Sequence, residues 1–154
     1  MEILKSIARN DMLICAVVAY LFAQLLKIFT TLYKEKKLDM HRLWSSGGMP
    51  SSHASTVTAL TIRCGLVCGV STPEFAICFI LASVVMYDAT GVRRAAGEQA
   101  KLLNQIVADL FSGKPAYAEK ALKELIGHTP LQVIMGALLG ILIGLFFPSL
   151  GVLV

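Results

Sequence analysis

The chain has 154 residues, of which 56% are hydrophobic, and a formal net charge of +4. Its mean hydropathy of +0.70 lies well above that of soluble proteins, so we expect an integral membrane protein with a single domain over residues 1–154. Nucleic-acid binding is disfavoured, because the basic residues flank the apolar runs and lack an aromatic platform. The four cysteines lie inside apolar runs without a C-x-x-C pair, and we interpret them as small buried hydrophobic residues.

Four membrane-spanning helices are predicted in chain order. After a short amphipathic lead over residues 1–10, the first span runs from about Asp11 to Tyr33, which at ~1.5 Å per residue is long enough for the ~30 Å hydrocarbon core. The later spans cover about residues 54–70, 75–87 and 131–147. Lys27, in the second half of the first span, either extends to the interface or points into the bundle and offers a charge to a ligand. Arg63, in the second span, needs a partner or the far interface.

A polar, glycine-rich turn precedes the second span and reads Ser-Ser-Gly-Gly-Met-Pro-Ser-Ser-His over residues 45–53. Pro50 suits the first turn of a helix, and Ser51 or Ser52 can cap its unpaired N–H groups. Those N–H groups and the helix dipole favour an anion, phosphate above all. His53 lies at the edge of this turn and titrates near neutrality. The alternative interpretation is a capped helix start with an exposed histidine.

Residues between the third and fourth spans depart from the membrane pattern. The third span ends in Tyr-Asp-Ala-Thr-Gly-Val-Arg-Arg at residues 87–94. An amphipathic helix over residues 95–111 then lies on the bundle or the membrane surface, and a second short helix covers residues 116–126. Within the last span, Gly136, Gly140 and Gly144 recur every four residues and favour tight helix contact. The predicted fold class is therefore all-α, a bundle of about four transmembrane helices with one or two amphipathic helices on the cytoplasmic side.

The charges predict the topology. Lys and Arg concentrate in residues 34–42 and 93–123, which places both connections in the cytoplasm and both termini outside the cell membrane. Lys27, His53, Asp88 and His128 then meet at one membrane face. We expect a polar pocket that opens to the cytoplasmic leaflet of the inner membrane.

Such a pocket suits phosphoryl transfer. Arg93 and Arg94 offer planar donors for phosphate oxygens. One imidazole can attack phosphorus while the other protonates the departing alkoxide, and Asp88 can fix the tautomer of the attacking ring. Each residue has a structural alternative: Asp88 as a cap or a partner of Arg93, the arginines as anchors on anionic lipid, and His128 as a plain helix start. A zinc or iron site on His53, His128 and Asp88 lacks the close ligand spacing of such sites, so no metal ion and no cofactor is expected.

Two segments resemble motifs of one superfamily. Pro50-Ser51-Ser52-His53 resembles the Pro-Ser-Gly-His motif of the type 2 phosphatidic acid phosphatase and vanadium haloperoxidase superfamily. Residues 127–140, Gly-His-Thr-Pro-Leu-Gln-Val-Ile-Met-Gly-Ala-Leu-Leu-Gly, resemble its last motif, in which the nucleophilic histidine precedes a helix. With Tyr-Asp-Ala-Thr-Gly-Val-Arg-Arg-Ala-Ala-Gly at residues 87–97, the chain is similar to a small divergent branch of that superfamily over roughly residues 24–144.

The resemblance implies that His128 is the nucleophile, that His53 is the general acid, and that Ser52 and nearby amides hold the phosphate. The chain also departs from the pattern. Gln132 stands where the superfamily has an aspartate, and Leu122 stands where it has an arginine. The first motif, a lysine and an Arg-Pro pair, is not found, and its nearest substitutes are Lys27 and Arg42. Asp88 and the two arginines that follow the third span could replace the missing groups.

These observations predict a membrane phosphatase that hydrolyses a lipid or isoprenoid phosphate or diphosphate monoester through a phosphohistidine. The alternative is a lapsed enzyme that binds, transports or scaffolds phosphate lipids. Since four spans replace the usual six of the superfamily, a homodimer could complete the site. The third histidine, His41, has no motif around it and is given no role. The predicted site comprises the catalytic residues His128, His53 and Asp88 and the phosphate-binding residues Arg93, Arg94, Ser51, Ser52 and Lys27.

Overall fold

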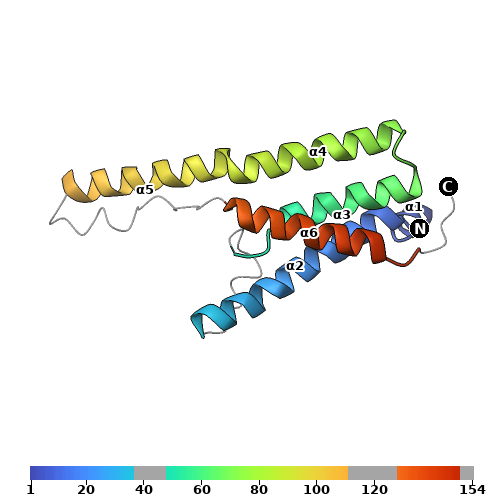
Figure 1. The fold of residues 1–154 in the computed structure, drawn as a ribbon, viewed down its shortest axis with the longest axis horizontal. Helices are drawn as coiled ribbons and strands as arrows, with labels where there is room; N and C mark the ends of the chain where they lie inside the picture. The colour runs from blue at the N-terminus through green and yellow to red at the C-terminus, as the bar shows by residue number, and fades with distance from the viewer. Residues whose placement is uncertain (37–47, 111–127, 150–154) are drawn as a thin grey trace.

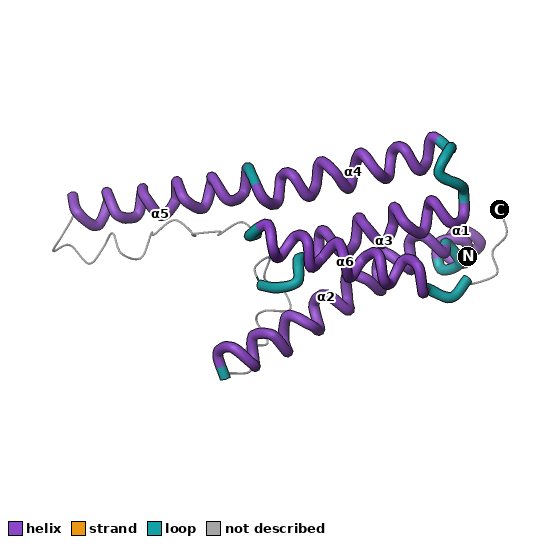
Figure 2. Tube along the Cα trace, in the orientation of Figure 1, coloured by secondary structure: helices purple, strands orange, loops and turns teal. Residues whose placement is uncertain are grey.

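The computed structural model describes residues 1–36, 48–110 and 128–149. In chain order these residues form α1 (Glu2–Ile7), α2 (Asp11–Glu35), α3 (Ser52–Val67), α4 (Pro73–Thr90), α5 (Val92–Leu110) and α6 (Pro130–Phe146) (Figure 1). The described ranges contain helices and turns and no strand (Figure 2). The predicted all-α helical bundle is therefore confirmed.

Side-chain caps define where the apolar helices begin. Asn10 accepts a hydrogen bond from the backbone N–H of Leu13 at the start of α2, and Ser51 does the same for Ala54 at the start of α3. Thr72 and Thr129 cap α4 and α6. Because each cap fixes its first turn, the second span begins a little earlier than the predicted residue 54.

The third span is longer than predicted. The α4 helix continues to Thr90 rather than to about residue 87, and α5 follows after Gly91 in almost the same direction (Figure 1). Within α5, the apolar stripe of Leu102, Leu103 and Ile106 is exposed, as befits an amphipathic helix. The second amphipathic helix, predicted over residues 116–126, lies outside the described residues.

The closest packing in the bundle joins α3 and α6. Gly136, Gly140 and Gly144 of α6 are all buried. A methyl group at Gly136 or Gly140 would overlap the carbonyl oxygen of Ser51 or Ser55, respectively. The predicted small-residue face therefore lets the two backbones meet, as it does in other membrane helix pairs.

A buried ion pair lies at the end of the bundle where α2 begins and α6 ends. The Arg63 side chain on α3 donates through Nε to Asp11 Oδ2 on α2, at 3.0 Å, and its Nη2 also pairs with that oxygen. Its Nη1 donates to the carbonyl of Phe147, at 3.1 Å, just after α6. Arg63 thus has the partner that a charge within an apolar segment requires, and it ties together the ends of three helices.

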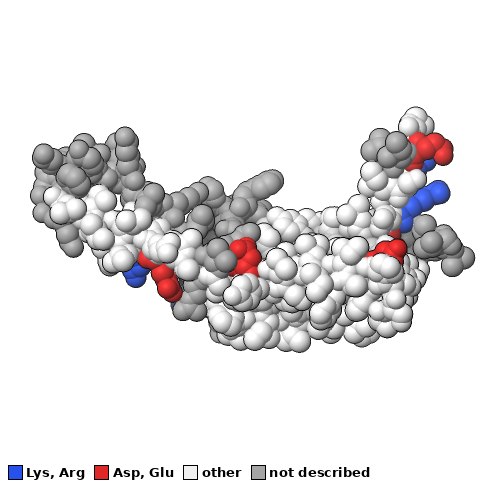
Figure 3. Space-filling view, turned by 90° about the horizontal axis from the view of Figure 1, so that it is seen from above, with Lys and Arg blue, Asp and Glu red and all other residues white. Residues whose placement is uncertain are grey.

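The surface of the bundle suits a bilayer. Residues 11–33 and 73–107 form helices long and apolar enough to cross a membrane, and α6 is a shorter apolar helix. The α3 helix is less apolar, since it contains Ser55, Thr58 and Thr61. These side chains are buried inside the bundle. On the face shown in Figure 3, an uncoloured stretch of surface separates the acidic patch near the middle of the view from the charged side chains toward the right.

Candidate active site

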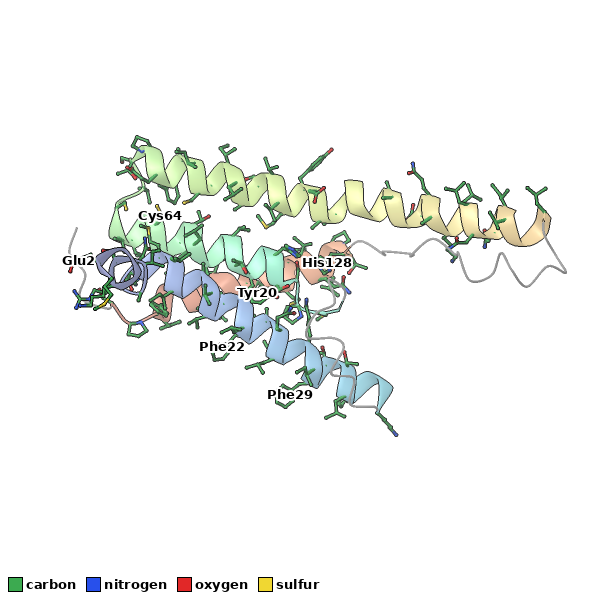
Figure 4. All side chains as sticks on the ribbon, turned by 180° about the vertical axis from the view of Figure 1, so that it is seen from behind. Glu2, Tyr20, Phe22, Phe29, Cys64 and His128 are labelled. Atoms are coloured by element: carbon green, nitrogen blue, oxygen red, sulfur yellow. The ribbon has the colours of Figure 1, made fainter. Side chains whose placement is uncertain are left out.

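The rings of His53 and His128 lie side by side at one end of the bundle. Their centroids are 6.4 Å apart and the ring planes are inclined by 56°. His53 belongs to the first turn of α3 and is half-buried, whereas His128 lies two residues before α6 and is buried. Figure 4 shows His128 where α6 begins, beside the start of α3.

Backbone hydrogen bonds hold the two segments in place. The N–H of Ser51 donates to the carbonyl of Gln132, at 3.0 Å, which joins the turn before α3 to the first turn of α6. The N–H of His128 donates to the carbonyl of Ala89, at 3.1 Å, near the end of α4. Three helix ends therefore set the separation of the two histidines.

Gln132 determines which nitrogen of His128 carries the proton. Its Oε1 accepts from the backbone N–H of Thr129, at 3.0 Å, and lies 3.2 Å from Nδ1 of His128. An atom that accepts from an N–H must be the amide oxygen, so Nδ1 has to be the donor in the second contact. In a neutral ring, Nε2 of His128 then keeps its lone pair and can act as a nucleophile.

A buried lysine lies at the same end of the bundle. The Lys27 side chain is fully buried, and its Nζ donates to Oγ of Ser52, at 3.1 Å. Gly48 packs against the aliphatic part of this lysine, since a methyl group there would lie 3.6 Å from Lys27 Cγ. Of the two positions that the sequence left open for Lys27, the structure has the one inside the bundle. The cluster therefore contains a cation beside the serine pair of the turn.

Of the remaining predicted residues, two have described side chains and two do not. Ser51 is buried and caps α3. Asp88 is half-buried on α4, next to the alanine whose carbonyl holds His128. Arg93 and Arg94 belong to the first turn of α5, but their side chains lie outside the described residues, as do Leu122 and Arg42. Among the residues that the structure describes, no three His, Cys, Asp or Glu side chains could together hold a metal ion.

The contact of Gln132 with His128 is not among the contacts predicted from the sequence. A signal for it was present, because Thr129-Pro-Leu-Gln132 has the spacing of a capping box, and the structure forms that box. Gln132 also lies four residues after His128, on the same side of the helix start. The carbonyl of Ala89, by contrast, has no sequence signal, because any residue supplies a carbonyl.

Comparison with known proteins places the chain in a family. The sequence model of a family described as "Divergent PAP2 family" matches residues 8–143. The chain belongs to the divergent PAP2 family. The matched range contains every candidate site residue, and the predicted resemblance is confirmed.

A membrane protein is similar to this divergent PAP2 chain over most of its length. The "Uncharacterized membrane protein YuiD" of Bacillus subtilis (strain 168) is 43% identical, over 88% of this chain and 92% of that protein. No solved structure matches the chain. With the apolar helices described above, this relative supports a membrane protein related to the PAP2 phosphatases.

Proposed function

We propose that this divergent PAP2 protein is a membrane phosphatase that hydrolyses a phosphate or diphosphate monoester of a lipid or isoprenoid. The observation that carries the proposal is the pair of histidine rings, 6.4 Å apart, one of which has its Nδ1 held by Gln132. An oxygen or phosphoryl group in hydrogen-bond contact with both rings, at about 3 Å from each, fits between them.

In the first step, the proposed nucleophile is Nε2 of neutral His128. It attacks phosphorus, and the bond between phosphorus and the ester oxygen breaks. The imidazolium of His53 gives its proton to that oxygen, so that the lipid leaves as an alcohol, or as a monophosphate if the substrate is a diphosphate. The product on the protein is a phosphohistidine, whose positive charge is delocalised in a ring that donates from Nδ1 to Gln132.

In the second step, water attacks the phosphohistidine. His53, now neutral, takes a proton from the water, the bond between phosphorus and Nε2 breaks, and inorganic phosphate leaves. Both histidines return to their starting protonation states. One ring thus serves as acid in the first half-reaction and as base in the second.

The negative charge of the phosphate needs fixed donors. Lys27 supplies a buried cation bonded to Ser52, and the start of α3 supplies backbone N–H groups. We assign phosphate binding to these groups and to Ser51, with Arg93 and Arg94 as further donors and Asp88 as a polar neighbour of His128. The site opens to the cytoplasmic leaflet of the inner membrane in this proposal, and a homodimer covers the faces that a four-helix bundle leaves exposed.

The test is release of inorganic phosphate from short-chain lipid phosphates by the purified full chain in nanodiscs. We expect His128→Ala and His53→Ala each to lower kcat by about a hundredfold or more, since loss of a positioned acid, base or nucleophile typically costs that much. The matched control is His41→Ala, which removes the third histidine and should leave the rate unchanged. With radiolabelled substrate, quenched wild type should carry label that is stable in alkali and lost in acid, and His128→Ala should carry none.

Equal traces of phosphate from wild type and His128→Ala contradict the enzymatic proposal. The presence of Gln132 in place of an aspartate favours one second candidate, a protein that binds phosphate lipids without turnover. In that case, wild type binds a lipid phosphate without releasing phosphate, and Lys27→Met, which keeps the aliphatic stem and removes the charge, weakens the binding.

A further inference from the structure

An apolar groove runs between α2 and α6, directly beside the turn at residues 48–50. Its volume of about 410 Å³ falls within the ~300–1,000 Å³ that is usual for small-molecule sites. Its lining is almost entirely hydrophobic and comes mainly from Leu26, Met49, Pro50, Leu138, Leu139 and Leu142.

The groove and the polar centre share a wall. Met49 and Pro50 line the groove, and the next two residues, Ser51 and Ser52, belong to the polar centre. Thr30 also lines the groove, and its hydroxyl donates to the carbonyl of Met49, at 2.8 Å. Lys27 lies between the groove-lining residues at positions 26 and 30 of the same helix, and its Nζ donates to Ser52, two residues after Pro50.

The direction of the groove matches that of a lipid chain. Its α6 wall extends from Met135 to Leu142, about 10 Å along the helix axis. That wall starts near the polar end of α6 and continues toward the middle of the bilayer-facing bundle. A lipid with its phosphate at the interface points its hydrocarbon chain the same way.

A second apolar pocket of nearly equal size provides a contrast. It has a volume of about 400 Å³ and lies at the opposite end of the bundle, where Leu13, Cys64 and Ile77 line it together with Glu74. An acidic residue repels a phosphate, and the histidines lie at the other end of α3. Size and hydrophobicity are therefore shared by both pockets, whereas only the groove between α2 and α6, of these two, has a wall formed by the turn that leads to Ser52, the partner of Lys27.

We propose that this groove holds one hydrocarbon chain of the substrate, whose phosphate lies at Lys27, Ser52 and the histidine pair. The inference rests on the proposed function for the position of the phosphate. Since a bilayer already keeps the chain away from water, the groove contributes close contact and orientation rather than transfer from water. It therefore selects substrates with a chain long enough to reach Leu142.

The experiment measures binding of alkylphosphonates, which carry a carbon–phosphorus bond and need no turnover. Wild type, Leu142→Trp and Leu145→Trp are compared in nanodiscs with butylphosphonate and dodecylphosphonate, and dodecanol serves as the probe without a headgroup. Leu142 lines the far end of the groove, whereas Leu145 does not, and the two side chains are 54% and 50% exposed. The added bulk therefore faces the groove in one variant and lipid in the matched control.

We expect Leu142→Trp to weaken dodecylphosphonate binding by roughly tenfold, because added bulk excludes the end of the chain, and to leave butylphosphonate binding unchanged. Leu145→Trp should match wild type with both probes. Equal effects of the two variants overturn the proposal, as does equally tight binding of dodecanol, which would indicate ordinary bilayer lipid. A changed oligomeric state of Leu142→Trp without a change in phosphonate binding also overturns it, in favour of a second copy in the groove.

Failure of the groove and failure of the phosphatase proposal are separate results. If wild type and His128→Ala release the same amount of phosphate, the enzymatic proposal fails. The phosphonate measurements then still test whether the groove binds a hydrocarbon chain. If wild type releases phosphate but the phosphonates bind all three proteins equally, the proposal for the groove is wrong and the proposal for the reaction is kept.

Discussion

At the scale of single residues, Gln132 has two tasks, and the second is one that a carboxylate performs in many catalytic histidine sites. Its Oε1 completes the cap of α6 through Thr129 and contacts Nδ1 of His128. An amide oxygen fixes the tautomer as a carboxylate does, but it carries no full charge to stabilise an imidazolium. In the proposed reaction, residue 132 thus orients the nucleophile without supplying a full charge to stabilise the phosphohistidine.

This separation gives the first prediction. Gln132→Met keeps the length of the side chain and removes both acceptor contacts, so we expect kcat to fall by about ten- to a hundredfold, as loss of a buried hydrogen bond of ~1–3 kcal/mol implies. Gln132→Glu keeps an acceptor and adds a charge, which favours protonated His128. The acidic limb of kcat/KM against pH should then move to higher pH, because the neutral nucleophile appears only at higher pH. An unchanged pH profile in Gln132→Glu would show that residue 132 does not contact the nucleophile.

At the scale of elements, the contact between α3 and α6 determines the geometry of the centre. Gly136 faces Ser51 and Gly140 faces Ser55, in each case against a backbone carbonyl. Gly144 instead faces the side chain of Ile62, where an added methyl group would lie 2.8 Å from Cβ. A carbonyl within a helix cannot move away from an added methyl group without moving the helix, so the first two glycines constrain the backbones most.

The second prediction follows from these contacts. Gly140→Ala should move α6 away from α3 and destabilise the protein by about 1–3 kcal/mol, the usual cost of overpacking, and the histidine pair should lose part of its activity. Unfolding in mixed micelles and phosphate release measure the two effects. The matched control is Leu145→Ala, on the same helix but half-exposed and outside the groove, which should change stability less. Normal stability and activity of Gly140→Ala would contradict the close approach of the two helices.

Some of these elements could be predicted from the sequence. The repeat of Gly136, Gly140 and Gly144 indicates a packing face by its period alone, and the caps Ser51 and Thr129 precede apolar runs in a pattern that predicts helix starts. The extension of α4 to Thr90 was missed, because Tyr-Asp-Ala-Thr resembles an interface segment although it contains no helix breaker before Gly91. Local sequence indicates where a helix can end, but packing decides where it does.

At the scale of the whole molecule, the approach of His53 and His128 follows from the order of the helices. Each histidine lies at the start of a predicted span, His53 at the second (α3) and His128 at the fourth (α6). Spans that alternate in direction run the same way when they are two apart. Their starts therefore lie at one end without any information on side chains. The contacts of Lys27 and Gln132 could not be predicted in this way, because they depend on which face of a helix turns inward and on side-chain rotamers.

The orientation of the bundle would decide which leaflet supplies the proposed substrate, and the charge distribution predicts this orientation. In the sequence, the segments rich in Lys and Arg, residues 34–42 and 93–123, follow the ends of α2 and α4 that lie on the histidine side, whereas the turn at residues 71–74 at the opposite end has neither residue type. The positive-inside rule therefore predicts that the histidine end faces the cytoplasm. Lys36 and Ser71 are both exposed and lie at opposite ends of the bundle, which makes them a matched pair of reporters.

The third prediction uses these two positions in intact cells with a maleimide that does not cross membranes. Lys36→Cys should be labelled only after the membrane is permeabilised, and Ser71→Cys should be labelled before. The parent chain is the blank, because its four cysteines are buried or half-buried. The reverse pattern would place the histidines at the outer face, and the substrate would then be a phosphate lipid of the outer leaflet. The groove between α2 and α6 starts at the histidine end. The labelling pattern therefore also indicates from which leaflet a hydrocarbon chain would enter the groove.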